Sequence, residues 1–137
     1  MLVAGIPARC AEMLSGTDGL QRHPDLGWTA GAYVCHVTDD LRIWAERVAG
    51  AALGGSQQVP GYDEDLLARG RQYDRVPLAG ALWSLQHAAR EWQEAVGLGL
   101  DRDVVLLHAG RGAQGAPDVA GITPTMPATT PGTFAAP

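Results

Sequence analysis

The longest continuous amphipathic pattern in the chain extends from Trp28 to Gly50. Its apolar residues recur at intervals of three and four, the spacing of an α-helix that buries one face. These residues are Ala30, Tyr33, Val34, Val37, Leu41, Trp44 and Val48. Thr29 can cap the start of this helix, and Gly50 lies where the helix can end. The pattern therefore predicts a long helix over about residues 29–50.

A second long helix is predicted directly after Pro77, a residue that suits the first turn of a helix. Its apolar residues follow the same spacing; they are Leu78, Leu82, Leu85, Ala89, Trp92 and Val96. His87 lies nearly opposite Leu85 on this helix. We therefore expect the imidazole of His87 on the solvent-exposed side.

Two shorter helices complete the pattern. The first is predicted from about Pro7 to Ser15, and a connector rich in Gly, Asp and Pro follows it. The second is capped by Asp63 and ends at Arg71 or Tyr73. Its inward-facing residues are expected to be Leu66 and Leu67. Together the four segments predict an all-α fold.

The sequence changes character after His108. Residues 109–137 are almost entirely Ala, Gly, Pro and Thr, with one aromatic residue and no Leu. Such a segment cannot form a helix with an apolar face, and it cannot bury a core of its own. We therefore predict an incomplete helical bundle over residues 1–108 and a disordered tail over residues 109–137.

Charge and hydropathy argue against two classes of partner. The net charge is −5 and no cluster of basic residues is present, so nucleic acid is not an expected partner. No apolar run approaches 18 residues, so no membrane span is expected. The first residues also lack the pattern of a signal peptide. These features predict a cytoplasmic protein.

Most of the Cys and His residues are poor candidates for ligands. Cys10 and Cys35 are too few and too far apart for a cysteine-based metal site or a disulfide framework. We expect both as small buried residues. His23 precedes a Pro in a loop, and His108 follows a short apolar run, so neither has a partner at ligand spacing.

His36 is the strongest candidate for a functional residue. On the predicted helix, His36, Asp40 and Arg47 fall along one flank of the apolar stripe, where an imidazole can face a pocket inside a bundle. Asp40 could orient the imidazole, and Arg47 could meet an anionic substrate. Alternatively, His36 is a partly buried residue hydrogen-bonded to its neighbours, Asp40 is a solvated carboxylate and Arg47 forms an ion pair within the helix.

Two segments resemble one protein family. Trp28, followed after seven residues by His36 in CHVTDDLRIWAERV, resembles the second helix of the DinB-like bundles. The closer resemblance is to the branch that includes mycothiol-dependent maleylpyruvate isomerase. The run GYDEDLLARGRQYDRVPLAGALWSLQHAAREWQEAV, residues 61–96, resembles the middle of that branch. Overall the resemblance covers about residues 9–108.

The resemblance implies an up-down four-helix bundle in which three His hold a divalent metal such as Zn²⁺. One His lies on the second helix, and two lie a turn apart on the fourth. Only the first has a counterpart here, and it is His36. The first helix of this chain is short, and its fourth helix is missing or not native.

A one-base shift of the reading frame can recover the missing helix from residues 121–137. The family pattern is Asn-Ala-His-Asp-Ala-x-His-His-x-Trp-Asp-Ile-Arg-Arg. The codons of GITPTMPATTPGTFAAP can encode His-Ala-His-Asp-Ala-Arg-His-His-Pro-Trp-Asp-Ile-Arg-Arg in the shifted frame. One match allows no codon choice. Met126 is encoded only by ATG and every Pro codon begins with CC, so the shifted frame across Met126 and Pro127 must read GCC, an Ala codon. We interpret the tail as a helix out of frame, shifted near residues 119–121. Alternatively, the match reflects free codon choice at the other positions.

The resemblance also implies a function. Relatives of this kind would use a divalent metal to acidify a bound water or thiol, with mycothiol as the thiol and a small electrophile as substrate. Isomerase or transferase chemistry is therefore expected, although the sequence names no catalytic residue. With His36 as the only metal ligand, we expect metal binding and catalysis to be impaired. The alternative is a non-catalytic helical module that forms a homodimer through the groove left open by the missing helix.

Overall fold

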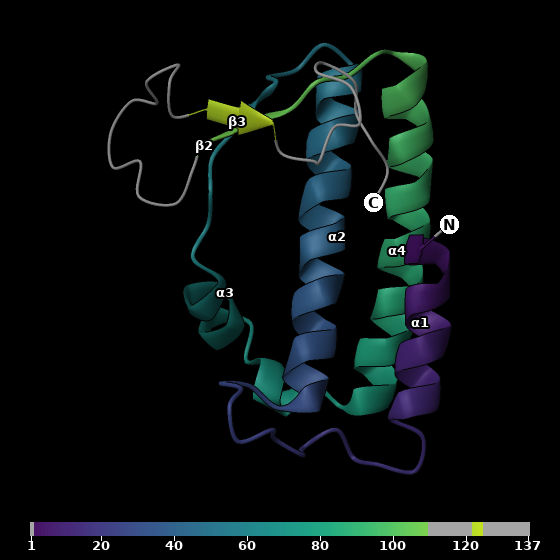
Figure 1. The fold of residues 1–137 in the computed structure, drawn as a ribbon, viewed down its shortest axis with the longest axis vertical. Helices are drawn as coiled ribbons and strands as arrows, with labels where there is room; N and C mark the ends of the chain where they lie inside the picture. Colours follow the sequence, from purple (N-terminus) through teal and green to yellow (C-terminus); the bar gives the residue numbers. More distant parts are fainter. Residues whose placement is uncertain (1, 110–121, 125–137) are drawn as a thin grey trace. The chain divides into compact units, whose positions relative to one another are not determined.

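The computed structural model describes residues 2–109 and 122–124 (Figure 1). This part of the chain is mostly helical, as the sequence predicted, and contains little strand. Its four α-helices are α1 (Leu2–Met13), α2 (Ala30–Ala52), α3 (Glu64–Gly70) and α4 (Leu78–Asp101). None of the described helices combines the length and the hydropathy needed to cross a membrane.

The chain divides into two compact units. Unit 1 comprises Met1–Ile43 and Asp63–Trp92, and unit 2 comprises Trp44–Tyr62 and Gln93–Pro137. Helices α2 and α4 both begin in unit 1 and end in unit 2. Each unit is therefore built around part of these two helices.

The capping residue predicted for α2 is confirmed. Thr29 is buried, and its Oγ1 accepts a hydrogen bond from the backbone N–H of Ala32 at 3.1 Å. This bond satisfies one of the N–H groups that have no partner in the first turn of a helix. The helix ends at Ala52, two residues beyond the predicted Gly50.

The bounds predicted for α1 are wrong. The helix begins at Leu2 instead of Pro7, and it ends at Met13 instead of Ser15. Pro7 lies inside the helix, where it cannot donate a hydrogen bond to the carbonyl of Val3. The helix extends past this missing bond because Val3 is only 2% exposed. Burial of an apolar side chain here outweighs the local preference of proline for the first turn.

Helix α3 is capped as predicted but presents a different face. Oδ1 of Asp63 accepts a hydrogen bond from the backbone N–H of Leu66 at 2.8 Å. The prediction that Leu66 faces inward is wrong, because this side chain is 61% exposed. Ala68 is the buried residue of the helix. Two residues correspond to about 200° around a helix, so Leu66 and Ala68 cannot share a face.

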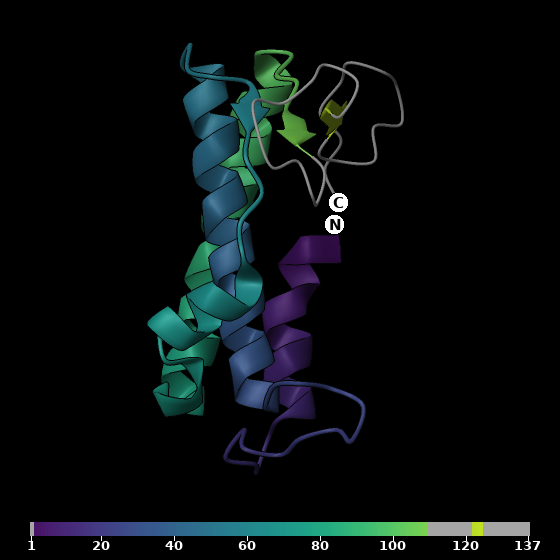
Figure 2. The same cartoon turned by 90° about the vertical axis from the view of Figure 1, so that its left-hand side faces the viewer.

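Helix α4 follows Pro77, as the sequence predicted, and supplies the centre of the unit 1 core. The backbone N–H of Ala81 donates to the carbonyl of Pro77 at 3.0 Å. Leu85 is fully buried in a cluster drawn from α2, α3, α4 and the turn that precedes α4. The cluster contains Ala32, Val34, Cys35, Ala68, Tyr73, Ala81 and Leu85. Helix α1 packs against this cluster through Ile6 and Cys10. Figure 2 shows the same helices turned by 90°. Cys35 is buried and Cys10 half-buried, and both are free thiols.

Unit 2 contains a small sheet that the sequence did not predict. Its strands are β1 (Gln58–Val59), β2 (Leu107–Ala109) and β3 (Ile122–Pro124), in that order. β1 pairs with β2 in parallel, and β2 pairs with β3 antiparallel. The tail predicted to be disordered from residue 109 thus contributes Ala109 and β3 to strands. Its other residues lie outside the part that the structure describes, as does most of the segment with the shifted-frame match.

We expect Leu85→Ala to lower the free energy of unfolding by about 2–5 kcal/mol, because it leaves a cavity in the centre of the core. The matched control is Leu66→Ala, which should change it by less than about 0.5 kcal/mol because Leu66 is exposed. Urea denaturation followed by circular dichroism measures both values. Equal losses from the two substitutions would contradict the burial described for them.

Candidate functional site

The structure places His36 in a group of aromatic side chains at the start of α2. Its imidazole is half-buried and lies against the indole of Trp28, with ring centroids 5.1 Å apart and planes tilted by 57°. The ring centroid of Trp28 also lies 5.2 Å from that of Tyr33 and 6.2 Å from that of Tyr73. The Trp28 and Tyr73 rings meet edge to face. Among the described residues, the interaction given for His36 is this ring contact with Trp28, and not the hydrogen bond that the alternative from the sequence considered.

The metal-ligand role predicted for His36 stays a prediction. No group of three or more His, Cys, Asp or Glu side chains in this part of the chain could hold a metal ion. Asp40, the carboxylate one turn further along α2, is half-buried and has its own interaction partner. Residues 125–137, which contain most of the shifted-frame match, lie outside the described part.

The other histidines have contacts of their own. His23 is exposed in a loop, where its Nδ1 accepts a hydrogen bond from the backbone N–H of Asp25 at 3.2 Å. His87 stacks on the exposed indole of Trp83 with ring centroids 3.8 Å apart, and its Nδ1 lies 2.9 Å from the Trp83 carbonyl oxygen. The backbone of His108 pairs with that of Thr123 in the sheet of unit 2.

Arg47, which the sequence placed on the same flank as His36, belongs to unit 2. Its Nη2 donates a hydrogen bond to the carbonyl of Pro60 at 2.8 Å. Its guanidinium also lies over the ring of Trp44, 4.4 Å from the centroid, and 5.9 Å from the centroid of Tyr62. These contacts hold Arg47 against the segment before α3, and its predicted role toward a substrate stays a prediction.

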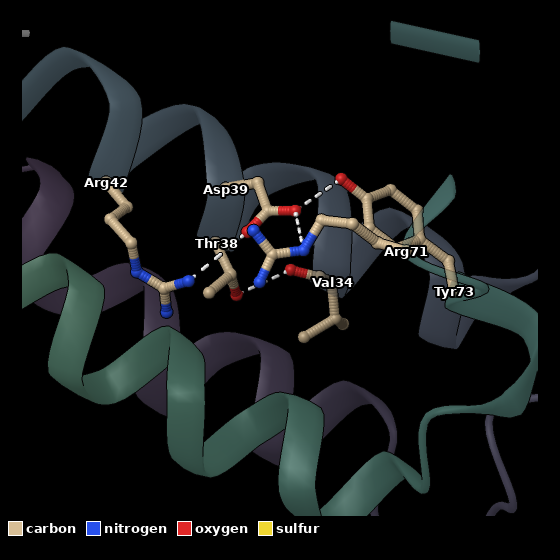
Figure 3. A network of polar contacts seen from close by, with 6 residues as sticks. All are labelled: Val34, Thr38, Asp39, Arg42, Arg71 and Tyr73. Carbon is tan, nitrogen blue, oxygen red and sulfur yellow. Dashed lines mark hydrogen bonds and ion pairs between the residues drawn. The ribbon is translucent and has the colours of Figure 1, made fainter. Parts of the chain in front are cut away.

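A buried carboxylate next to His36 was missed from the sequence. Asp39 is only 4% exposed, although it precedes the half-buried Asp40. Its Oδ2 accepts a hydrogen bond from the Tyr73 hydroxyl at 2.7 Å and lies 3.2 Å from Nε of Arg71. Its Oδ1 lies 3.4 Å from Nη1 of Arg42, one turn along α2 (Figure 3). Three donors therefore surround one carboxylate.

The turn after α3 brings two of these donors together. Gln72 adopts a left-handed backbone conformation with φ of 53° and precedes the 3₁₀ helix η1 (Tyr73–Arg75). The residues on either side of it, Arg71 and Tyr73, both reach Oδ2 of Asp39. Left-handed φ values are uncommon for residues other than glycine, so the surrounding contacts must maintain this turn.

Burial and the Asp39 charge shift the pKa values of two neighbouring groups. Burial raises the pKa of the Tyr73 phenol above its ordinary value of 10.0, and the hydrogen bond to Asp39 raises it further. Burial also raises the pKa of the Cys35 thiol; the charge of Asp39 adds to this increase and Arg71 opposes it. Both groups are therefore protonated at neutral pH, so Tyr73 is a hydrogen-bond donor and Cys35 is not an activated nucleophile.

Two cavities in unit 1 adjoin this network and share Tyr73 as a lining residue. The larger has a volume of about 350 Å³ and lies between Trp28, Tyr73 and the charged residues of α3 and η1. The smaller has a volume of about 140 Å³ and is lined by Asp39 and its two arginines, together with Cys35 and Ser84. Tyr73, which donates to Asp39, therefore borders both cavities.

One signal in the sequence could have indicated Asp39. Ala32, Cys35 and Asp39 follow one another at intervals of three and four, so Asp39 continues a stripe of buried residues. A carboxylate in such a stripe needs donors from elsewhere in the fold. No local pattern identifies Tyr73 as a donor, because it lies 34 residues away.

Comparison with known proteins found no relative of this chain. No protein-family model, no curated protein and no solved structure matches the sequence or the fold.

We expect Tyr73→Phe to change the pH dependence of stability. Because the pKa of Tyr73 is higher in the folded than in the unfolded chain, the folded protein retains a proton above about pH 10 that the unfolded chain loses. The free energy of unfolding of the unmodified chain should therefore fall with rising pH, by up to about 1.4 kcal/mol per pH unit from this group. Tyr73→Phe should remove this contribution.

Urea denaturation at several pH values between about 9 and about 11 measures the slope. Tyr33→Phe is the matched control and should keep the full slope, because it leaves Tyr73 in place. The chain contains no Lys, and burial also raises the pKa values of Cys10 and Cys35. These two thiols are present in both variants, so the difference in slope between Tyr73→Phe and Tyr33→Phe isolates the contribution of Tyr73. A Tyr73→Phe protein with an unchanged slope would contradict the assignment.

Proposed function

We propose that this chain is a DinB-like helical domain of the mycothiol-dependent maleylpyruvate isomerase branch, with its fourth-helix segment encoded out of frame. The observation that carries the proposal is the contact between Trp28 and His36. These two residues belong to the segment that resembles the second helix of that family, and their rings lie 5.1 Å apart. A ring packed in this way has a restricted orientation, which favours a metal-ligating imidazole.

His36 alone does not fit a metal site. Catalytic zinc sites usually have three protein ligands, and the described residues provide no such group. In this proposal, the two other His ligands belong to the shifted frame of residues 121–137. The chain as written therefore lacks tight metal binding and the thiol-dependent isomerase or transferase activity of an intact relative.

The first test is to resequence the coding region across codons 115–137 and beyond the present stop codon. We expect a one-base correction to open a frame that encodes two His at i and i+4 on a helix. The frame-corrected protein should then bind about one divalent ion per chain, measured by elemental analysis after gel filtration. The chain as written should bind none.

Two substitutions in the frame-corrected protein locate the metal. His36→Ala should reduce the bound ion to background, whereas His87→Ala should leave it unchanged because His87 is engaged with Trp83 on α4 and has no part in the proposed ligand set. Confirmed bases with no corrected frame would remove the metal-site proposal, and His36 would then be a structural member of the aromatic group. A stable metal-free homodimer of the chain as written would instead favour the helical interaction module.

A further inference from the structure

The smaller cavity of unit 1 carries more positive than negative charge. Of the side chains that line it, Arg42 and Arg71 are cationic and Asp39 is anionic, so their formal charges sum to +1. The rest of the lining is neutral and includes the hydroxyl-bearing residue Ser84. This local excess contrasts with the net charge of −5 for the whole chain.

Asp39 uses only part of the donor capacity of the two arginines. It lies 3.4 Å from one terminal nitrogen of Arg42 and 3.2 Å from Nε of Arg71. A guanidinium carries five N–H donors in a fixed plane. Neither arginine contacts a second acceptor among the described residues. The side chains of Arg42 and Arg71 are 33% and 53% exposed, so a small molecule can reach them from solvent.

We propose that this cavity binds a small oxyanion, with Arg42 and Arg71 as its principal donors and Ser84 as a further donor. Guanidinium groups match the geometry of carboxylate and phosphate oxygens, and Asp39 holds both groups in fixed orientations before the ligand arrives. The volume of 140 Å³ corresponds to about four or five water molecules at ~30 Å³ each, which suits inorganic phosphate or a short-chain carboxylate.

This site does not depend on His36 or on a metal. All of its lining residues belong to unit 1 and to the described part of the chain. The competing explanation is that Arg42 and Arg71 serve only to compensate the buried charge of Asp39 and bind no ligand. In that case, oxyanions would bind no better than chloride.

The experiment follows the Nε–H resonances of Arg42 and Arg71 by ¹H–¹⁵N nuclear magnetic resonance while malonate or phosphate is added. Chloride at matched ionic strength is the reference, because simple screening affects every exposed arginine. We expect saturable shifts with at least one oxyanion and none with chloride. Saturation with either oxyanion supports the proposal, and the one that binds more tightly identifies the ligand as a carboxylate or a phosphate.

Two variants and a control localise the binding. Arg42→Gln should weaken it about tenfold, because a charge-assisted hydrogen bond is lost. Ser84→Leu should abolish binding by filling the cavity, and it leaves every partner of Asp39 in place, so it serves as the test if Arg42→Gln does not fold. Arg90→Gln removes the same charge from an exposed position on α4 that does not line this cavity, and it should bind normally. Absence of saturable shifts, or equal weakening by Arg90→Gln and Arg42→Gln, would overturn the proposal.

Discussion

The buried carboxylate of Asp39 is the interaction on which the organisation of unit 1 depends. Removing a carboxylate from water costs several kcal/mol unless charged or hydrogen-bonding partners compensate for it. Here the partners come from three places in the chain: α2 itself, the residue after α3, and the 3₁₀ turn before α4. The carboxylate of Asp39 therefore has all three of its hydrogen-bonding and charged partners only when these segments are folded together.

Tyr73 connects this polar network to the aromatic group around His36. Its hydroxyl donates to Asp39, while its ring meets the edge of Trp28, whose indole in turn lies against the imidazole of His36. The orientation of His36 thus depends, through two aromatic contacts, on a carboxylate three residues further along the same helix. His36 and Asp39 are three residues apart on α2, so their side chains are neighbours on one side of this helix.

The two proposed functions use different chemistry. A metal site requires imidazoles that the described residues do not supply, so it depends on the corrected frame. The oxyanion site requires only guanidinium groups already held by Asp39. The resemblance to a thiol-dependent enzyme family and the charge of the cavity are therefore independent lines of argument, and either can fail without the other.

The amino-acid pattern was sufficient to predict the two long helices and the N-terminal caps of α2 and α3. The three-four spacing predicted α2 and α4, and Thr29 and Asp63 were identified as caps, because periodicity and capping depend on residues within a turn or two of one another. Which side chains the helices bury follows instead from how the segments pack together in the folded chain. Leu66 is exposed and Ala68 buried, and Asp39 lies inside the protein while Asp40 is only half-buried, because burial depends on what packs against each face. For Asp39 that partner is Tyr73, 34 residues away, and no local pattern encodes a contact over such a distance.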